Sequence, residues 1–234
     1  MNAEIIPAIM PKDLENISIL AGLVKNHAET VQLDLMDGDY VPEKTWPFFY
    51  KGDYDFEAIV KEEQSLPFWQ DINYELDLMV AKPENRLDDW FGLGASRVIF
   101  HYASIADWDK IRSIDPFFRN FTQLGLAVTI HDDIKDVKEI LSEGHFDFIQ
   151  VMAIAHIGYM GEPFEEAALE LIDTLHARYP EMIISVDGGV SLDSIAALAD
   201  AGASRFVSGS GVYGGGVAKE NIDNLREAAK ISTE

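Results

Sequence analysis

The chain lacks cysteine, and no stretch of it approaches the length of an apolar membrane span. Without cysteine there are no disulfide bonds and no thiolate chemistry, which fits a reducing compartment. A membrane-spanning helix needs roughly 20 consecutive apolar residues. The segment from Met1 to Pro7 carries neither the basic residues nor the apolar run of a signal peptide. We therefore expect a cytoplasmic protein.

Basic residues are also scarce. The chain has 18 lysines and arginines against 41 aspartates and glutamates, and its formal net charge is −23. A surface of this charge argues against nucleic acid and anionic membranes as general partners. A substrate that carries a phosphate group would need local compensation, for instance from backbone N–H groups.

Short β-rich runs alternate with segments of helical spacing along the chain. A repeat of eight such units predicts a single (β/α)8 TIM barrel over residues 1–234, because a barrel of this type typically has about 250 residues. An open doubly wound sheet has the same strand count and stays an alternative. The predicted strands are Glu4–Met10, Thr30–Met36, Ile72–Met79, Ser96–His101, Leu126–His131, Phe146–Met152, Met182–Asp187 and Arg205–Ser208.

The segment from Lys44 to Gln70 is longer than a simple loop and rich in aromatic residues. We expect a helix around residues 55–64 within it. Its aromatic side chains would either pack on the barrel or form a surface for a homo-oligomer; these residues are Trp46, Phe48, Phe49 and Tyr50.

Two aspartates each close an apolar run and precede a glycine turn: Asp34 in Val31-Gln-Leu-Asp-Leu-Met-Asp-Gly38, and Asp187 in Ile183-Ile-Ser-Val-Asp-Gly-Gly189. An acidic residue at the carboxyl end of a parallel barrel strand is typical of catalysis. Residues two apart share a face of a strand. Asp34 therefore shares the barrel-facing side with Gln32 and Met36, as Asp77 does with Met79. Buried carboxylates are unfavourable unless they are paired, metal-bound or at the mouth.

Several runs, in order along the chain, resemble the ribulose-phosphate 3-epimerase family. They are Ile6-Pro-Ala-Ile9, Gln32-Leu-Asp-Leu-Met-Asp-Gly38 with Val41-Pro42, Asp77-Leu-Met79 with Pro83-Glu84, Val186-Asp-Gly-Gly-Val190 and Ser208-Gly-Ser-Gly-Val-Tyr-Gly214. The resemblance implies a (β/α)8 barrel that inverts C3 of a ketose phosphate. Such a reaction needs two general acid/base groups and stabilisation of an enediolate, which a divalent metal ion can supply.

By the resemblance, Asp34 and Asp187 are the two acid/base residues and also metal ligands. The methionines at family positions around the reacting centre are Met36, Met79 and Met152. Three methionines inside a barrel are also common as plain packing.

The sequence departs from the family at three site positions. Gln32 and Asp77 stand where the family has histidine metal ligands, and Ala8 stands where it has a substrate-site serine. In one interpretation, Gln32, Asp34, Asp77 and Asp187 hold a cation through oxygen, which favours Mg²⁺ or Mn²⁺ with Zn²⁺ as an alternative. In the other, the metal is lost, and Asp77 or a strand-end histidine, His101 or His131, has a new role. At least one carboxylate should then have a raised pKa.

Glycine pairs follow the seventh and eighth predicted strands, where barrels of this type bind phosphate through backbone N–H groups. They predict a phosphate site at Gly188, Gly189, Gly209 and Ser210, although ordinary tight turns have the same composition. The loop after the sixth strand resembles the family's substrate loop through Gly158 and Gly161. Met160 and Glu162 replace a glycine and a glutamine of that loop, and Glu162 would place negative charge near the substrate.

Two other functions stay open. Related barrels cleave or decarboxylate sugar and nucleotide phosphates with a lysine-bearing acidic array, but the lysine that follows Asp77, Lys82, is five residues further on. The changed residues Gln32, Asp77 and Ala8 would also suit a sugar-phosphate binder without turnover. Outside the site, Asp132 and Asp133 are predicted to cap a helix.

Overall fold

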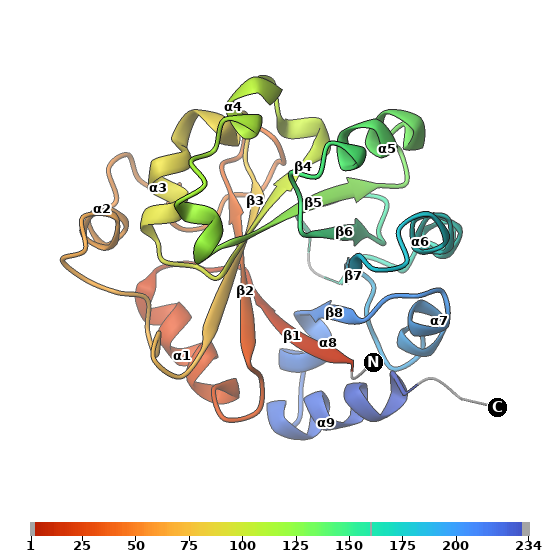
Figure 1. Ribbon diagram of the computed structural model, residues 1–234. Helices are drawn as coiled ribbons and strands as arrows, with labels where there is room; N and C mark the ends of the chain where they lie inside the picture. Colours follow the sequence, from red (N-terminus) through yellow and green to blue (C-terminus); the bar gives the residue numbers. More distant parts are fainter. Residues whose placement is uncertain (1–2, 160, 231–234) are drawn as a thin grey trace.

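The computed structural model describes residues 3–159 and 161–230, and its centre is a closed barrel of eight parallel strands (Figure 1). Each strand pairs with the next one in sequence, and the last pairs with the first, so the open-sheet alternative is wrong and the (β/α)8 barrel is confirmed. The strands are β1 (Glu4–Ile9), β2 (Thr30–Met36), β3 (Asn73–Met79), β4 (Arg97–His101), β5 (Gln123–Thr129), β6 (Phe148–Met152), β7 (Ile183–Asp187) and β8 (Arg205–Ser208).

Helices surround the barrel on its outside (Figure 1). A short extra helix, α8, follows β8 directly, ahead of the longer α9 that returns along the barrel wall. The helices are α1 (Leu14–Val24), α2 (Tyr54–Val60), α3 (Leu87–Gly92), α4 (Trp108–Arg112), α5 (Ile134–Ser142), α6 (Ala167–Arg178), α7 (Ile195–Asp200), α8 (Ser210–Tyr213) and α9 (Ala218–Ala228), with 3₁₀ turns η1 (Pro83–Arg86), η2 (Tyr102–Ser104) and η3 (Phe118–Asn120).

Most predicted strand limits agree with the structure to within two residues, and the fifth strand is the exception. We predicted Leu126–His131, but β5 runs from Gln123 to Thr129. An interior glycine, Gly125, weakens the strand pattern near the start of β5. Glycine is needed there because the Phe148 ring fills the space that a Cβ would occupy. At the other end, Asp132 accepts hydrogen bonds from the backbone N–H and the hydroxyl of Thr129 and turns the chain before His131.

Aspartates begin several of the helices, as the sequence predicted for α5. The Asp133 carboxylate accepts a hydrogen bond from the Lys135 N–H at 2.8 Å and caps α5. In α2, Asp53 caps in the same way through the Phe56 N–H, so this helix begins at Tyr54 and ends at Val60, four residues before the predicted end. The cap satisfies a backbone donor that the first turn of a helix leaves free.

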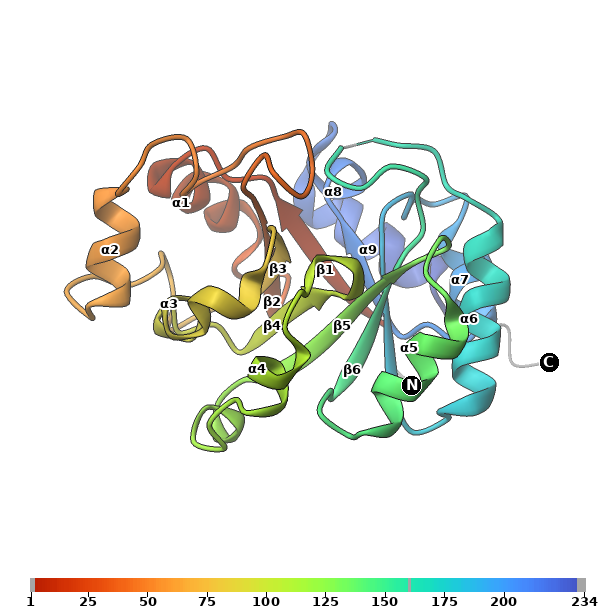
Figure 2. The same cartoon turned by 90° about the horizontal axis from the view of Figure 1, so that it is seen from above.

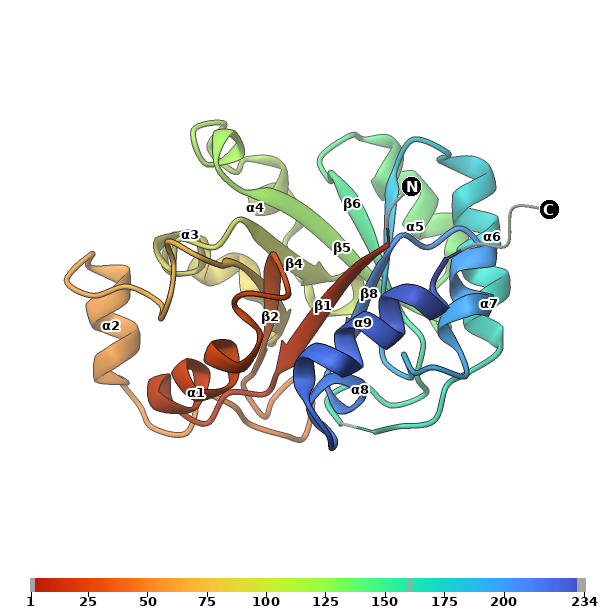
Figure 3. The same ribbon diagram turned by 90° about the horizontal axis from the view of Figure 1, so that it is seen from below.

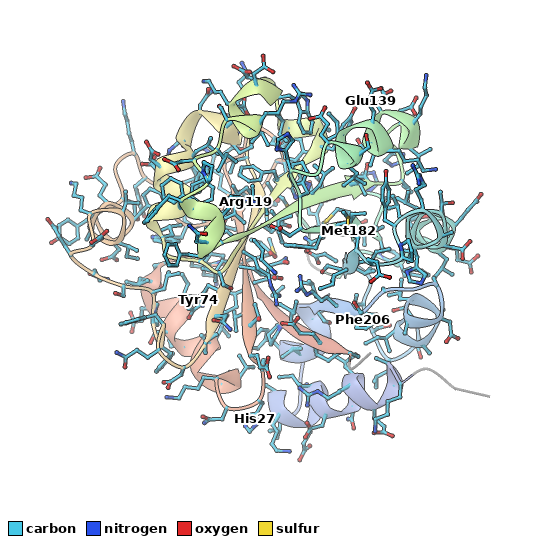
Figure 4. The ribbon with its side chains drawn as sticks, in the orientation of Figure 1. His27, Tyr74, Arg119, Glu139, Met182 and Phe206 are labelled. Atoms are coloured by element: carbon cyan, nitrogen blue, oxygen red, sulfur yellow. The ribbon has the colours of Figure 1, made fainter. Side chains whose placement is uncertain are left out.

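The Asp133→Ala variant should lower the free energy of unfolding by about 1 kcal/mol, because α5 loses its side-chain cap. For a chain of this size that corresponds to a fall in Tm of roughly 2–4 °C, measurable by circular dichroism. Glu139→Ala is the control, since Glu139 is an exposed carboxylate of the same helix without a capping bond (Figure 4). Equal losses in the two variants would contradict the role of the cap.

The apolar core lies between the strands and the helices. It includes Val31, Leu33 and Leu35, whose side chains face outward from β2, as the alternation predicted. Tyr74 of β3 and Phe206 of β8 belong to the same layer and are labelled in Figure 4. The opposite faces of the strands therefore fill the barrel interior.

The amino-terminal end of the barrel interior holds paired charges. Arg97 donates hydrogen bonds to Glu75 at 2.9 Å and to Glu4 at 3.1 Å, and Arg205 lies 3.1 Å from Glu4. Thr30 also donates to Glu4. Every acid in this layer thus has a basic partner, which is the condition under which buried charges are tolerated.

The aromatic segment has one buried residue, one partly buried residue and two exposed residues. Trp46 is buried and donates from its ring N–H to Asp53 at 2.9 Å, and Phe48 packs near Trp90. Phe49 and Tyr50 are exposed. The structure thus confirms core packing for half of this set, and a role for the exposed half in self-association stays a prediction.

The loops after β2 and β6 lie with α8 at one end of the barrel, and the amino terminus lies toward the other end (Figures 2 and 3). The loop end is the carboxyl end of the strands, where barrels of this type carry their active sites. Within residues 3–159 and 161–230, no helix has the length and apolar character needed to cross a membrane.

Candidate active site

A pocket of about 520 Å³ opens at the carboxyl ends of the strands. Both predicted acid/base residues and all ten predicted substrate- and phosphate-site residues line it; they are Asp34, Asp187, Ala8, Met36, Met79, Met152, Gly158, Gly161, Gly188, Gly189, Gly209 and Ser210. Sequence reasoning missed Met10, Ile154, Tyr159, Val190, Val207 and Ser208, of which Met10 shares the strand face of Ala8 by simple alternation.

Strand register brings three aspartates together beneath this pocket. Asp34 of β2 is the direct neighbour of Asp77 of β3, and Asp187 of β7 reaches the same point from across the barrel. Each aspartate offers an oxygen, and these oxygens all lie within 4.8 Å of one another. Asp34 and Asp77 are buried, as predicted for the barrel-facing side of the strands.

Gln32 joins the two candidate acid/base residues. Its amide nitrogen donates hydrogen bonds to Asp34 at 2.8 Å and to Asp187 at 2.7 Å. Its amide oxygen has no hydrogen-bond partner among the described residues, although the side chain is fully buried. A half-turn about the last side-chain bond would exchange nitrogen and oxygen, so Gln32 can present either a donor or an oxygen ligand to this cluster.

The two strand-end histidines have different surroundings. His101, at the end of β4, is buried with its Nε2 2.7 Å from Asp77 Oδ1. His131 lies beyond the end of β5 and is exposed. From the sequence, either histidine could have a role in the site. In the structure, His101 contacts the aspartate cluster and His131 does not.

Burial and mutual repulsion raise the pKa values of Asp34 and Asp187. Desolvation raises the pKa of Asp34 well above its ordinary value, and the charges of Asp187 and Asp77 raise it further. Desolvation raises the pKa of Asp187 to about 7, with a contribution from Asp77, although hydrogen bonds from Gln32 and the Gly188 N–H oppose the shift. In the absence of a cation, protons thus remain on this cluster near neutral pH, as predicted from the crowding of carboxylates.

The aspartate cluster contrasts with the paired charges at the other end of the barrel. Among the described residues, no lysine or arginine forms an ion pair with Asp34, Asp77 or Asp187. Buried carboxylates without cationic partners reduce stability, so proteins retain them mainly where they act on a ligand.

The cluster fits a divalent cation by its donor chemistry. Asp77 Oδ2 and Gln32 Oε1 are buried oxygens without hydrogen-bond partners in the described parts of the chain. Oxygens of Asp34, Asp77 and Asp187 lie together here, and Gln32 would add its own oxygen after the half-turn of its amide, which gives an all-oxygen donor set that suits hard cations. Three carboxylates and one amide can therefore hold a divalent ion here.

The glycine turns after β7 form the opposite wall of the pocket. Gly188 and Gly189 have φ values of +88° and +65°, and a Cβ at either position would lie under 3 Å from Ile154 or Phe164. Glycine is therefore required at both positions, because their positive φ values and the close packing of Ile154 and Phe164 leave no room for a side chain. In the described chain, no lysine or arginine lines this pocket, so an anion bound here would rely on backbone N–H groups and on hydroxyl groups such as that of Ser210.

The loop after β6 closes one side of the pocket through Gly158, Tyr159 and Gly161. The carboxylate of Glu162, expected near the substrate, is not part of the pocket lining and lies 3.5 Å from His156 Nδ1. Met160 lies outside the described residues.

Comparisons with known proteins agree with this geometry. A family model described as "Ribulose-phosphate 3 epimerase family" matches residues 4–213. The ribulose-phosphate 3-epimerase of Schizosaccharomyces pombe is 26% identical over 235 residues, which cover 100% of this chain and 97% of that protein. The ribulose-phosphate 3-epimerase of Escherichia coli K12 is 27% identical over 239 residues, covering 98% of each.

Among solved structures, 3-keto-L-gulonate-6-phosphate decarboxylase from Vibrio cholerae superposes with a TM-score of 0.69, at 13% identity and with 98% of each chain covered. At this identity the similarity shows a shared fold and leaves the chemistry open. The family match is specific where the fold match is not, and it spans all eight strands and the whole pocket. The chain therefore belongs to the ribulose-phosphate 3-epimerase family, a family of carbohydrate-phosphate epimerases.

Proposed function

We propose that this protein is a ribulose-phosphate 3-epimerase-like isomerase that inverts C3 of a ketose phosphate. The observation that carries the proposal is the placement of Asp34 and Asp187 in one pocket. They come from β2 and β7, which β1 and β8 separate around the barrel. Two carboxyl groups that reach a substrate from different strands provide the two proton-transfer groups that an epimerisation needs.

The protonation of the pair supports this role. An epimerase needs one group as base and the other as acid, and the roles exchange when the reaction runs backward. Without a bound cation, the pKa of Asp187 is raised to about 7, and that of Asp34 is also raised. Two interacting carboxyl groups in such an environment share protons near neutral pH, so one can remove a proton while the other supplies one.

A divalent cation would be held by Asp34, Asp77, Asp187 and Gln32. The site would prefer Mg²⁺ or Mn²⁺ to Zn²⁺, because all the ligand atoms are oxygen. When bound, such an ion acts as a Lewis acid that stabilises negative charge on the substrate oxygens. The residues of the chain hold the protons and orient the sugar.

The substrate would lie between the methionines and the glycine turns. Met36, Met79, Met152 and Ala8 line one pocket. The methionines would surround the reacting carbon, and the lack of a hydroxyl at Ala8 leaves this wall apolar. The phosphate would bind backbone N–H groups at Gly188, Gly189, Gly209 and Ser210, with Gly158 and Gly161 covering it. Backbone donors bind an anion without basic side chains, which suits a chain of net charge −23.

We further propose that residues 1–234 form one domain, that the protein acts in the cytoplasm, and that its partners are phosphorylated sugars, not nucleic acid or membrane. The negative charge supports the last point. We also propose that the protein forms a homo-oligomer, for which Phe49 and Tyr50 offer exposed aromatic surface. Sedimentation velocity measures the oligomeric state.

Incubation with ribulose 5-phosphate in deuterated water should exchange the C3 proton and produce the C3 epimer, because proton removal and return pass through side chains that equilibrate with solvent. Proton NMR measures both events. Pentulose and hexulose phosphates that differ in chain length serve as alternative substrates. Cleavage or decarboxylation would instead indicate the related barrel chemistries, and tight binding without exchange, at any metal tested, would indicate a binder that has lost turnover.

A further inference from the structure

His101 and Asp77 form a buried pair beside the candidate active site. They lie on neighbouring strands, where Asp77 is the register partner of Ile99, two residues before His101. The His101 Nε2 to Asp77 Oδ1 distance is 2.7 Å, and both side chains are almost fully buried. An imidazole that carries a proton on Nε2 donates to this oxygen.

The pair uses only one of the two Asp77 oxygens. Asp77 Oδ2 is buried and has no hydrogen-bond partner in residues 3–159 and 161–230. Asp77 also contributes an oxygen to the cluster with Asp34 and Asp187, within 4.8 Å. A buried acceptor without a partner is unfavourable, most of all on a charged group, so a ligand would explain an oxygen left in this state at a cluster of acids.

His101 is itself held in place from two sides. The Tyr40 ring packs against it with ring centroids 5.5 Å apart. The Ser104 hydroxyl donates to the His101 carbonyl at 2.9 Å and fixes the backbone after β4. The imidazole is therefore a rigid support for the Asp77 carboxylate.

We propose that His101 is a positioning residue that holds Asp77 Oδ1 and thereby directs Asp77 Oδ2 toward a divalent cation shared with Asp34 and Asp187. The inference rests on the cation site of the proposed function. A carboxylate with one oxygen fixed loses rotational freedom before the ion arrives, which strengthens binding. Residues that support metal ligands in this way typically contribute 10–100-fold to metal affinity.

Two amide variants separate positioning from general structure. His101→Gln keeps an N–H donor at about the reach of Nε2, whereas the shorter side chain of His101→Asn ends too far from Asp77 Oδ1. Calorimetric titration of Mn²⁺ into the metal-stripped full chain, without substrate, should show affinity about 10–100-fold lower for His101→Asn. His101→Gln should recover most of the wild-type affinity. The exposed His131, exchanged as His131→Asn, is the matched control and should bind as the wild type does.

Thermal unfolding of the same metal-free variants supplies a second measurement. A purely structural role would lower Tm in both His101 variants while leaving Mn²⁺ affinity unchanged, and this result would overturn the inference. Equal loss of affinity in the Gln and Asn variants would also overturn it, as would a wild type that binds no Mn²⁺. The proposed epimerisation is tested separately by C3 exchange, so its failure and the failure of the positioning role are distinguishable.

Discussion

The Asp34→Asn and Asp187→Asn variants should each lower the rate of C3 epimerisation by about 10²–10⁴-fold, the usual contribution of a general acid or base. An amide is nearly the same size as a carboxyl group but neither accepts a substrate proton nor supplies one. The remaining oxygen can still accept a hydrogen bond from Gln32, so the geometry of the cluster is largely kept. NMR of the two epimers over time measures the loss.

Solvent exchange gives a sharper result than turnover. If each aspartate serves one face of C3, a variant that lacks one of them can still remove and return the proton on the other face. Each variant should therefore exchange deuterium into at most one epimer, and the two variants should act on opposite epimers. Inversion at the wild-type rate in either variant would contradict the assignment, as would exchange of the same epimer by both.

Asp39→Asn is the matched control for these variants. Asp39 lies in the loop after β2, close in sequence to Asp34, but it is exposed. The Asp39→Asn variant loses the same charge as the other two variants and should retain activity, because Asp39 does not line the pocket. A loss as large as that of the Asp34 and Asp187 variants would show that net charge, and not proton transfer, determines the rate.

Divalent cations should stabilise the protein more strongly at high pH than at low pH. At pH 8, Mn²⁺ at 100 times its dissociation constant should add about 2.7 kcal/mol to the free energy of unfolding, which corresponds to a rise in Tm of roughly 5–10 °C. At pH 5.5 the rise should be smaller, because protons on Asp34 and Asp187 compete with the ion. Calorimetric unfolding at both pH values measures the difference.

The direction in which pH changes the stability of the metal-free protein follows from the raised pKa values of Asp34 and Asp187. Between the ordinary aspartate pKa and about 7, the folded chain keeps a proton on Asp187 that the unfolded chain releases. The folded state binds more protons in this window, so the contribution of Asp187 to stability is present at low pH and is lost as pH rises through 7. The raised pKa of Asp34 acts in the same direction. A metal-free protein whose Tm rises across this window would contradict these shifts.

Salt must be controlled in this experiment, because any cation screens a chain of net charge −23. Na⁺ at equal ionic strength gives the screening contribution alone. The Asp77→Asn variant gives the site contribution, since it removes one charged ligand of the cluster while leaving Asp34 and Asp187 in place. Its Mn²⁺-induced rise at pH 8 should fall toward that of Na⁺.

Much of the fold followed from local pattern. Strand β2 begins and ends where the alternation of side chains predicted, because its outward-facing apolar residues alternate with residues that face the barrel interior. The predicted limits of β8 also agree with the structure. The limits of β5 were wrong at both ends. Gly125 interrupts the strand pattern because the Phe148 ring occupies the space of a side chain at that position. The Asp132 side chain accepts a hydrogen bond from the Thr129 N–H, and the strand ends before His131. Both causes are contacts made by side chains and not properties of the local sequence.

The pocket lining was also predictable to a large extent. Strand ends and glycine turns identify which residues reach the carboxyl face of a barrel, and the predicted Asp34, Asp187 and glycines lie there. The sequence left open whether Gln32 and Asp77 hold a cation or have another role. It did not distinguish His101 from His131 as the histidine at the site. It also missed the support of Asp77 by His101, which depends on the register of β3 and β4.

The sequence by itself determined the eightfold βα repeat, the positions of carboxylates at strand ends and the glycine turns that follow, because all of these are local patterns of spacing. Only the tertiary structure decided which charges are paired. Barrel closure joins Gln32 to Asp187 across 155 residues, gives Glu4 and Glu75 their arginines, and leaves Asp34, Asp77 and Asp187 with none. Hydrogen bonds and ion pairs depend on separations of a few ångströms between distant residues, and only the register of the closed barrel sets those separations.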